Sequence, residues 1–219
     1  MNLCKSIKTL AAATVFGLGA SATQAGIINW SGPFDTLTGS DVFNNGSLVE
    51  AFNMGEAASD VEVNGVSFVA TDGILSNSTS ANFLNAESSG DPDYDDLLRT
   101  LDFGNGTSFN VSIGGGNLKV GTDYLVQAWF TDLRAGFASR TMVLGDGNAN
   151  TVDVNASAGG LGQYAIGRFV ADSGSQTLSL ASPGFGNVHL NAFQVREVPV
   201  PAPLALLGIG ILALSLRQK

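Results

Sequence analysis

Hydrophobic and polar residues alternate in short stretches along most of the chain, which is the period of half-buried β-strands. Between Val61 and Ala70, for example, Val63 and Val69 fall on one side of the expected strand and Phe68 on the other. The pattern predicts strands near Ile27–Trp30, Leu48–Asn53, Val61–Ala70, Phe109–Ile113, Asp123–Asp132, Thr141–Leu144, Thr151–Asn155, Tyr164–Ala171, Thr177–Ser182 and Val188–Arg196.

Turn residues separate these stretches, and a helical period is nearly absent. Pairs such as Asn64-Gly65 and Asp146-Gly147 provide the positive φ that tight hairpins need. One short helix is expected at Tyr94–Leu101, which has an acidic start and helically spaced leucines. We therefore predict an all-β fold, a two-sheet antiparallel β-sandwich with jelly-roll topology and one short helix.

The first 25 residues follow a different pattern. Lys5 and Lys8 precede an apolar stretch at 9–20, and small residues lead up to Ala25. This order predicts a secretory signal peptide with an apolar helix, cleaved after Ala25 or three residues earlier. Cys4 is the only cysteine and lies in the removed segment, so the mature protein is expected to have no thiol and no disulfide.

The last 22 residues, 198–219, combine spaced prolines, an uncharged apolar run at 204–216 and a basic end. The prolines favour an extended segment, and the run that follows is expected to form a helix of roughly 20 Å, short against about 30 Å of bilayer hydrocarbon. The basic end favours the cytoplasmic side, which places the rest of the chain across the membrane. The residues that carry the pattern are Val198, Pro199, Pro201, Ala202, Arg217 and Lys219.

This tail resembles the C-terminal sorting segment of PEP-CTERM proteins, with Val200 between the prolines in place of the glutamate that gives the segment its name. The resemblance implies an exported protein that begins as an inner-membrane-anchored precursor. It also implies that an exosortase recognises the tail, and that the mature form reaches the cell surface or the extracellular space in association with exopolysaccharide. An ordinary single-pass C-terminal anchor is the alternative.

Residues 26–197 remain as one domain, long enough to bury a substantial core. This part carries all nineteen acidic residues of the chain against six basic ones, which gives a net charge of −13. Such a surface repels phosphate backbones, so nucleic acid is not an expected partner.

Three blocks of the domain carry a second resemblance: Leu118–Arg134, Gly162–Asp172 and Asn191–Arg196. They are similar to secreted bacterial β-sandwich domains of galactose-binding-like appearance. The resemblance implies a jelly-roll sandwich and, since such folds often bind carbohydrate, a carbohydrate ligand. It does not indicate which residues bind.

Two acidic segments are candidates for calcium, which prefers several hard oxygen ligands. The alternatives are a solvated acidic loop in which Asp91 or Asp93 caps the short helix, and an ordinary Asx-rich hairpin turn at residues 146–153. The candidate ligands of the first segment are Asp91, Asp93, Asp95 and Asp102, and those of the second are Asp146, Asn148, Asn150 and Asp153.

Aromatic and arginine side chains form a third candidate site, because sugars stack on exposed rings while polar groups bind their hydroxyls. The candidates are Trp129, Tyr94, Arg134 and Arg140. Alternation places Trp129 on the same face as Gln127, and a polar neighbour favours solvent on that face. A core position for Trp129 is the alternative, since aromatics within strands commonly pack inside.

The sequence shows few of the residue patterns that are typical of catalytic sites. His189 is the only histidine and lies within an apolar strand, and no G-x-S-x-G is present. The sequence therefore favours a non-enzymatic surface or matrix protein that binds exopolysaccharide, with calcium as the one cofactor considered. The alternatives are a carbohydrate-active hydrolase with a carboxylate pair and a purely structural matrix protein.

Overall fold

The computed structural model describes residues 26–137, 139–184 and 186–199. The signal peptide and most of the sorting tail expected from the sequence, with Pro201, Ala202, Arg217 and Lys219, lie outside the described residues. Within those ranges, none of the helices has the length and apolar character needed to cross a bilayer.

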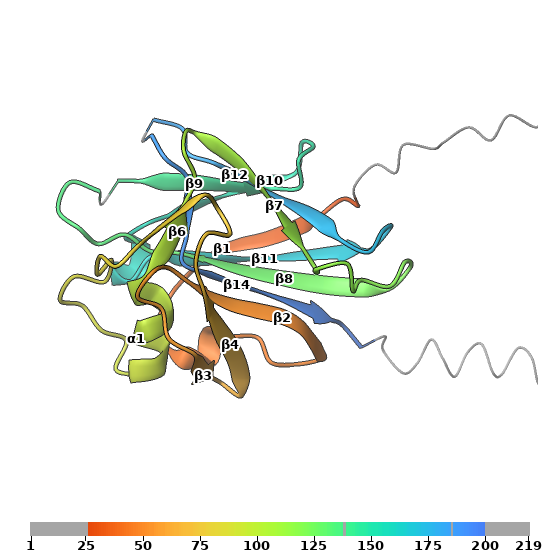
Figure 1. The fold of residues 1–219 in the computed structure, drawn as a ribbon, viewed down its shortest axis with the longest axis horizontal. Helices are drawn as coiled ribbons and strands as arrows, with labels where there is room; N and C mark the ends of the chain where they lie inside the picture. The colour runs from red at the N-terminus through yellow and green to blue at the C-terminus, as the bar shows by residue number, and fades with distance from the viewer. Residues whose placement is uncertain (1–25, 138, 185, 200–219) are drawn as a thin grey trace, which may run out of the picture.

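The larger of the two main layers is a seven-stranded sheet (Figure 1). Its strands are antiparallel except for the parallel pair β2 and β4. In spatial order they are β1 (Asn29–Asp35), β11 (Gln163–Val170), β8 (Asp123–Phe130), β14 (Ala192–Glu197), β2 (Ser47–Met54), β4 (Val66–Thr71) and β3 (Val61–Val63).

An antiparallel four-stranded sheet faces it, and a small three-stranded sheet closes one end. The four strands are β10 (Thr151–Asn155), β9 (Thr141–Gly145), β12 (Gln176–Ala181) and β7 (Ser108–Ile113). The three are β13 (His189–Leu190), β6 (Leu101–Phe103) and β5 (Asn77–Thr79). From β7 onward the chain passes repeatedly between the two main sheets, so the predicted all-β sandwich is confirmed.

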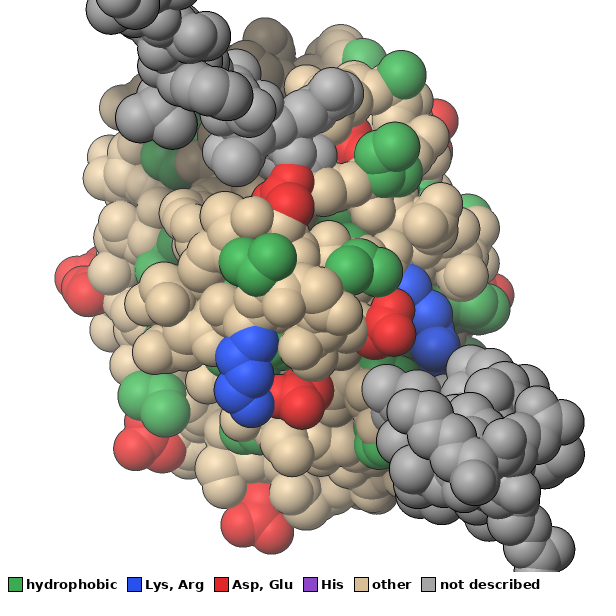
Figure 2. Space-filling model, turned by 90° about the vertical axis from the view of Figure 1, so that its right-hand side faces the viewer, with side chains coloured by type: hydrophobic (Ala, Val, Ile, Leu, Met, Phe, Trp, Pro, Cys, Tyr) green, Lys and Arg blue, Asp and Glu red, His purple; other side chains and the backbone are tan. Residues whose placement is uncertain are grey.

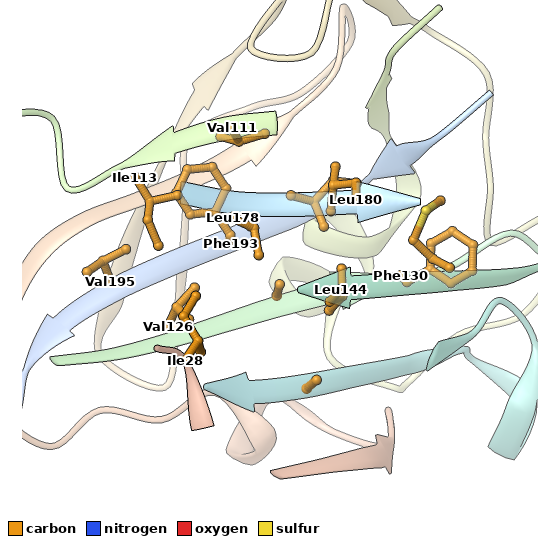
Figure 3. Close-up of a cluster of buried hydrophobic side chains, with 14 of the residues drawn as sticks. Ile28, Val111, Ile113, Val126, Phe130, Leu144, Leu178, Leu180, Phe193 and Val195 are labelled. Carbon is orange, nitrogen blue, oxygen red and sulfur yellow. The ribbon is translucent and has the colours of Figure 1, made fainter. Parts of the chain in front are cut away.

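The main core lies between these sheets (Figure 3). β12 shows how it forms: every second residue of the strand is buried, so Leu178 and Leu180 both point inward. Phe193 and Val195 of β14 meet them from the opposite layer. Burial of such side chains contributes about 1.5–3 kcal/mol each.

A second core lies on the other face of the seven-stranded sheet. Helix α1 (Pro92–Arg99) covers that face with Leu97 and Leu98. Phe68 of β4, in the same sheet, also packs into this core, with its ring centroid 5.7 Å from that of Trp129. β8 is consequently buried at every position after Asp123. The centre of the large sheet is therefore shielded from solvent on both faces.

Buried polar side chains attach a loop to this second face. The Gln127 Nε2 atom donates to the backbone of residues 41–46, and its Oε1 accepts from the Gln194 Nε2 at 2.8 Å. The Arg196 guanidinium donates to three carbonyls of the same segment. Because buried polar groups need partners, these side chains fix the loop over the sheet.

Three expectations need correction in detail. The strand expected at Val61–Ala70 is a hairpin, which turns at Asn64 and Gly65 with φ of 50° and 72°. The strand expected at Val188–Arg196 divides into β13 and β14. The helix begins two residues earlier than expected, because the Asp91 side chain accepts from the amides of residues 93 and 94 and thus caps it.

Candidate functional site

A cavity of about 360 Å³ lies at the end of the sandwich where β8 finishes. The loop after β8, the small three-stranded sheet and the segment before β13 supply its walls. This volume falls within the range of small-molecule sites, roughly 300–1,000 Å³. The side chains that give the walls their character are Phe83, Phe103, Phe137, Arg134, Arg140 and His189.

Asp132, which follows β8 closely, is fully buried and binds both arginines. The Arg134 Nε and Nη2 atoms donate to its two oxygens at 2.8 and 2.9 Å, the forked geometry that strengthens such pairs. The Arg140 Nη1 atom donates to Oδ2 at 3.2 Å, and its Nη2 donates to the carbonyl of Asn187. One carboxylate therefore positions two guanidinium groups at the cavity.

Arg134 also lies between two aromatic rings. Its guanidinium carbon is 4.2 Å from the centroid of Phe83 and 4.5 Å from that of Phe137. Phe83 reaches this place because its carbonyl accepts from the amide of Leu133. These contacts hold Arg134 in place although its side chain is 36% exposed.

Arg140 and His189 have polar atoms that are buried without a partner. The Arg140 Nε and both ring nitrogens of His189 form no hydrogen bond of acceptable geometry with the described residues. The His189 ring packs 4.2 Å from that of Phe130, centroid to centroid. Burial lowers the pKa of His189 well below its usual value, and the charges of Arg140 and Arg134 lower it further. The Thr131 backbone opposes this shift only in part, so the imidazole is neutral at neutral pH.

Burial also lowers the pKa of Arg140, which the neighbouring Asp132 opposes. Since a guanidinium starts from such a high pKa, Arg140 stays charged at neutral pH. The cavity thus offers cationic donors, a neutral imidazole and aromatic surface. Together these groups can bind an oxygen-rich molecule and orient it.

The structure brings together two of the four predicted carbohydrate residues, Arg134 and Arg140. The other two, Trp129 and Tyr94, lie in the second core, and neither side chain is accessible. The Trp129 Nε1 atom donates to the Tyr94 hydroxyl at 3.0 Å. Burial is also the main cause that raises the pKa of Tyr94 far above its usual value.

The expectation that Trp129 is exposed is therefore wrong, and the alternative of a core position is correct. Its strand face does carry Gln127, but a protein loop covers that face in place of solvent. The Gln127 amide is satisfied by that loop and by Gln194. The polar side chain of Gln127 therefore indicated a buried hydrogen-bonding position and not an exposed one.

The carboxylates of the first predicted calcium segment do not converge. Asp91 caps helix α1, and Asp95 accepts from the hydroxyls and the backbone around residues 88–89. Asp93 is exposed. Asp102 lies buried in β6, where its Oδ2 accepts from the amide of Ile74 at 2.7 Å. The loop interpretation, with Asp91 as the cap, agrees with these bonds.

The second predicted calcium segment forms a turn between β9 and β10. Asp146 is buried, and its carboxylate accepts from the amides of Asn148 and Ile28 at 2.8 and 3.2 Å. Asn148, Asn150 and Asp153 are exposed. Across the described part of the chain, no three His, Cys, Asp or Glu side chains lie close enough to share a metal ion.

The sequence pattern does not single out Asp132, Phe83, Phe137 or Asn187, and it assigns His189 only a packed or edge position. Asp132 carries a local signal, since it stands two residues before Arg134 directly after a strand. Phe83 carries no such signal, because only the folded chain brings it to the loop after β8. Of the predicted sorting residues, Val198 and Pro199 are described, and the Val198 amide donates to the Asp123 carbonyl.

No known family model matches this sequence, and no curated protein matches it. Solved structures that are similar include the plant receptor-like kinase ANX2, with 12% identity, a TM-score of 0.48 and coverage of 70% of this chain and 49% of that chain. The ANX2 ectodomain from Arabidopsis thaliana matches at 13% identity and a TM-score of 0.46, over 73% and 54%. The extracellular domain of ANXUR1 from the same plant has 13% identity, a TM-score of 0.46 and coverage of 70% and 49%. The chain thus spans about half the length of these proteins.

Proposed function

We propose that this chain is an exported protein of the cell surface or extracellular matrix, and that its sandwich binds exopolysaccharide through the cavity. The observation that carries the proposal is the combination of aromatic walls and guanidinium donors around about 360 Å³ of space. Sugars need both features, since ring C–H groups pack on aromatic surface and hydroxyls need polar partners.

The position of the cavity supports this role. β8 begins at Asp123, whose carbonyl accepts from the Val198 amide, and ends at Phe130, whose ring packs against that of His189 in the cavity wall. Its eight residues span roughly 25 Å. A chain anchored through its tail would therefore hold the cavity at the end away from the membrane.

Sorting is proposed on the sequence alone. The leader at 1–25 and the Pro-rich apolar tail at 198–219 favour export, an inner-membrane precursor and processing by an exosortase. The fold is compatible with removal of the tail, because the last strand ends at Glu197. Cell fractionation tests this proposal: deletion of residues 204–219 should release the protein from membranes, and retention would contradict it.

Binding without turnover fits the lining better than hydrolysis does. A glycosidase normally uses two carboxyl groups that flank the scissile bond. The described lining residues include no acidic side chain, and the oxygens of Asp132, behind the two arginines, are taken up by them. A hydrolase and a purely structural matrix protein remain the competing functions.

Nucleic acid is not proposed as a partner. On the end of the molecule seen in Figure 2, each visible basic side chain lies beside an acidic one. Lys119 and Glu197 form an ion pair at 3.0 Å. A face without a basic stripe offers a phosphate backbone little attachment.

Affinity electrophoresis of the full-length chain, in mild detergent and in gels that contain the producing cells' exopolysaccharide, tests the proposal. We expect saturable retardation that Arg134→Ala weakens by about tenfold or more, a loss of about 1.4 kcal/mol. Arg168→Ala is the matched control, since Arg168 is exposed on β11. Unchanged mobility would favour the structural role, and release of reducing ends would favour the hydrolase.

A further inference from the structure

The cavity carries an excess of positive charge. Two guanidinium groups face one carboxylate, that of Asp132, and the third titratable group, His189, is neutral. The described lining residues include no further acidic side chain. One positive charge is therefore left over, in a protein whose domain is otherwise strongly acidic.

Arginine hydrogen-bond donors without a partner also favour an anionic ligand. Arg140 is only 5% exposed, and its Nε atom has no hydrogen-bond partner among the described residues. Arg134 uses Nε and Nη2 for Asp132, and its Nη1 has no hydrogen bond to the described residues. A buried donor without a partner destabilises the fold, so a ligand oxygen that reaches it recovers the missing hydrogen bond. Guanidinium donors match a carboxylate best.

His189 adds a second requirement. A neutral imidazole has one donor nitrogen and one acceptor nitrogen, and neither forms a hydrogen bond of acceptable geometry within the described chain, although the backbone of Thr131 interacts with the ring. A hydroxyl group can donate and accept, so it suits the edge of this ring. A compact molecule that carries both a carboxylate and a hydroxyl would therefore match the groups of the cavity.

Resting on the proposed function, we infer that the cavity takes a sugar acid, with its carboxylate on Arg134 and Arg140 and a hydroxyl at His189. Because a single positive charge is uncompensated, a monoanion fits better than a phosphorylated sugar, whose phosphate carries about two negative charges at neutral pH. The ligand is then either a free uronic acid or a uronate residue within an acidic polysaccharide.

Calorimetric titration of the full-length chain in mild detergent separates these cases. The probes are galacturonate, its methyl ester, galactose, polygalacturonate and a neutral galactan. We expect the acids to bind at least about tenfold more tightly than the ester and the neutral sugars, and added salt to weaken them. Affinity for the free acid identifies a small-molecule site, and affinity for the polymer alone identifies an in-chain uronate.

Arg134→Gln should remove the preference for acids, whereas Arg168→Gln should leave it unchanged. If Arg134→Gln does not fold, the comparison of acid and ester on the natural chain still decides. Equal binding of acid, ester and neutral sugar would overturn the inference and leave the proposed function standing. If none of these probes binds and mobility in exopolysaccharide gels is unchanged, both the inference and the proposed function are wrong.

Discussion

Asp132 is the residue that assembles the cavity. It is inaccessible to solvent, and its two oxygens bind Arg134 and Arg140 at the same time. A buried ion pair adds little net stability over an apolar pair, but removal of one partner leaves a charge stranded. The cavity therefore depends on a carboxylate that itself does not line it.

Replacement of Asp132 by Asn should lower the free energy of unfolding by about 3–5 kcal/mol, because it leaves the buried Arg140 without its counter-ion. Urea denaturation followed by circular dichroism measures this loss. Asp153→Asn is the matched control: Asp153 is exposed, and its change should stay within about 0.5 kcal/mol. Equal stability of both variants would mean that the ion pairs contribute nothing.

His189 should make stability depend on pH. Its folded-state pKa lies well below 6.5, mainly because of burial, so the unfolded chain binds the proton first as the pH falls through about 6.5. Stability is therefore present above that pH and is lost below it, by at most about 1.4 kcal/mol for each pH unit.

The matched variant for this effect is His189→Phe, which keeps an aromatic ring beside Phe130 and does not titrate. Melting temperatures at pH 7.5 and 5.5 should differ less in the variant than in the natural chain. Glu50 and Asp102, with pKa values raised by burial, titrate in both proteins, so their contributions cancel. An identical pH dependence in both would show that His189 is not buried and neutral.

At the scale of elements, β8 shows what alternation can and cannot predict. Alternation along β8 places Tyr124 and Phe130 on the face opposite Trp129, and the structure has them in the main core and Trp129 in the second core. Alternation does not show that helix α1 and the loop at 41–46 cover the second face. Those elements come from a distant part of the chain, so their contribution is not visible in the strand's own sequence.

Trp129→Phe should lower stability by about 1–3 kcal/mol, because the Tyr94 hydroxyl loses its buried indole donor. Affinity for exopolysaccharide should not change, since Trp129 is remote from solvent. Urea denaturation and affinity electrophoresis of the same preparation measure both quantities. Weaker binding at unchanged stability would mean that Trp129 contributes to the binding site.

Helix α1 tests the calcium hypothesis. Asp91→Ala should cost about 1 kcal/mol through the lost cap, and Asp93→Ala less, because Asp93 accepts no bond at the helix start. Since Asp91 and Asp95 already accept protein donors, neither calcium nor a chelator should shift the melting temperature of the natural chain. A chelator-sensitive melting temperature that calcium restores would establish a metal site instead.

At the scale of the whole molecule, the last strand lies at the centre of the large sheet. β14 pairs with β2 on one side and with β8 on the other, although it is the final strand of the described chain. Its residues Phe193 and Val195 belong to the main core. The domain is therefore incomplete until synthesis has passed Glu197, directly before the tail.

Truncation after Pro199 should leave the melting temperature unchanged, whereas truncation after Leu190 should abolish cooperative unfolding. The shorter chain loses two ladders of hydrogen bonds, and Phe193 alone is expected to contribute about 3–5 kcal/mol if removed. Differential scanning calorimetry of both chains provides the comparison. A cooperative transition in the shorter chain would mean that β14 is dispensable.

Local sequence was enough to locate most strands. The expected Thr151–Asn155 coincides with β10, and β9 extends only one residue beyond its expected range. The short strands β5 and β6 were not predicted, because three residues are too few to show the alternation of a strand. The shift in the helix reflects a capping residue just outside the apolar pattern.

The sequence by itself determined the all-β class, the positions of the turns and the unusual composition of both ends, because these depend on neighbours within a few residues. Only the tertiary structure decided which strand faces are covered and which side chains meet at the cavity. Phe83, Arg134 and His189 lie far apart in the chain, and packing of separate layers brings them together. Arg134 and Arg140 could be nominated from the sequence, but their shared carboxylate and their unused donors depend on burial, which no local pattern encodes.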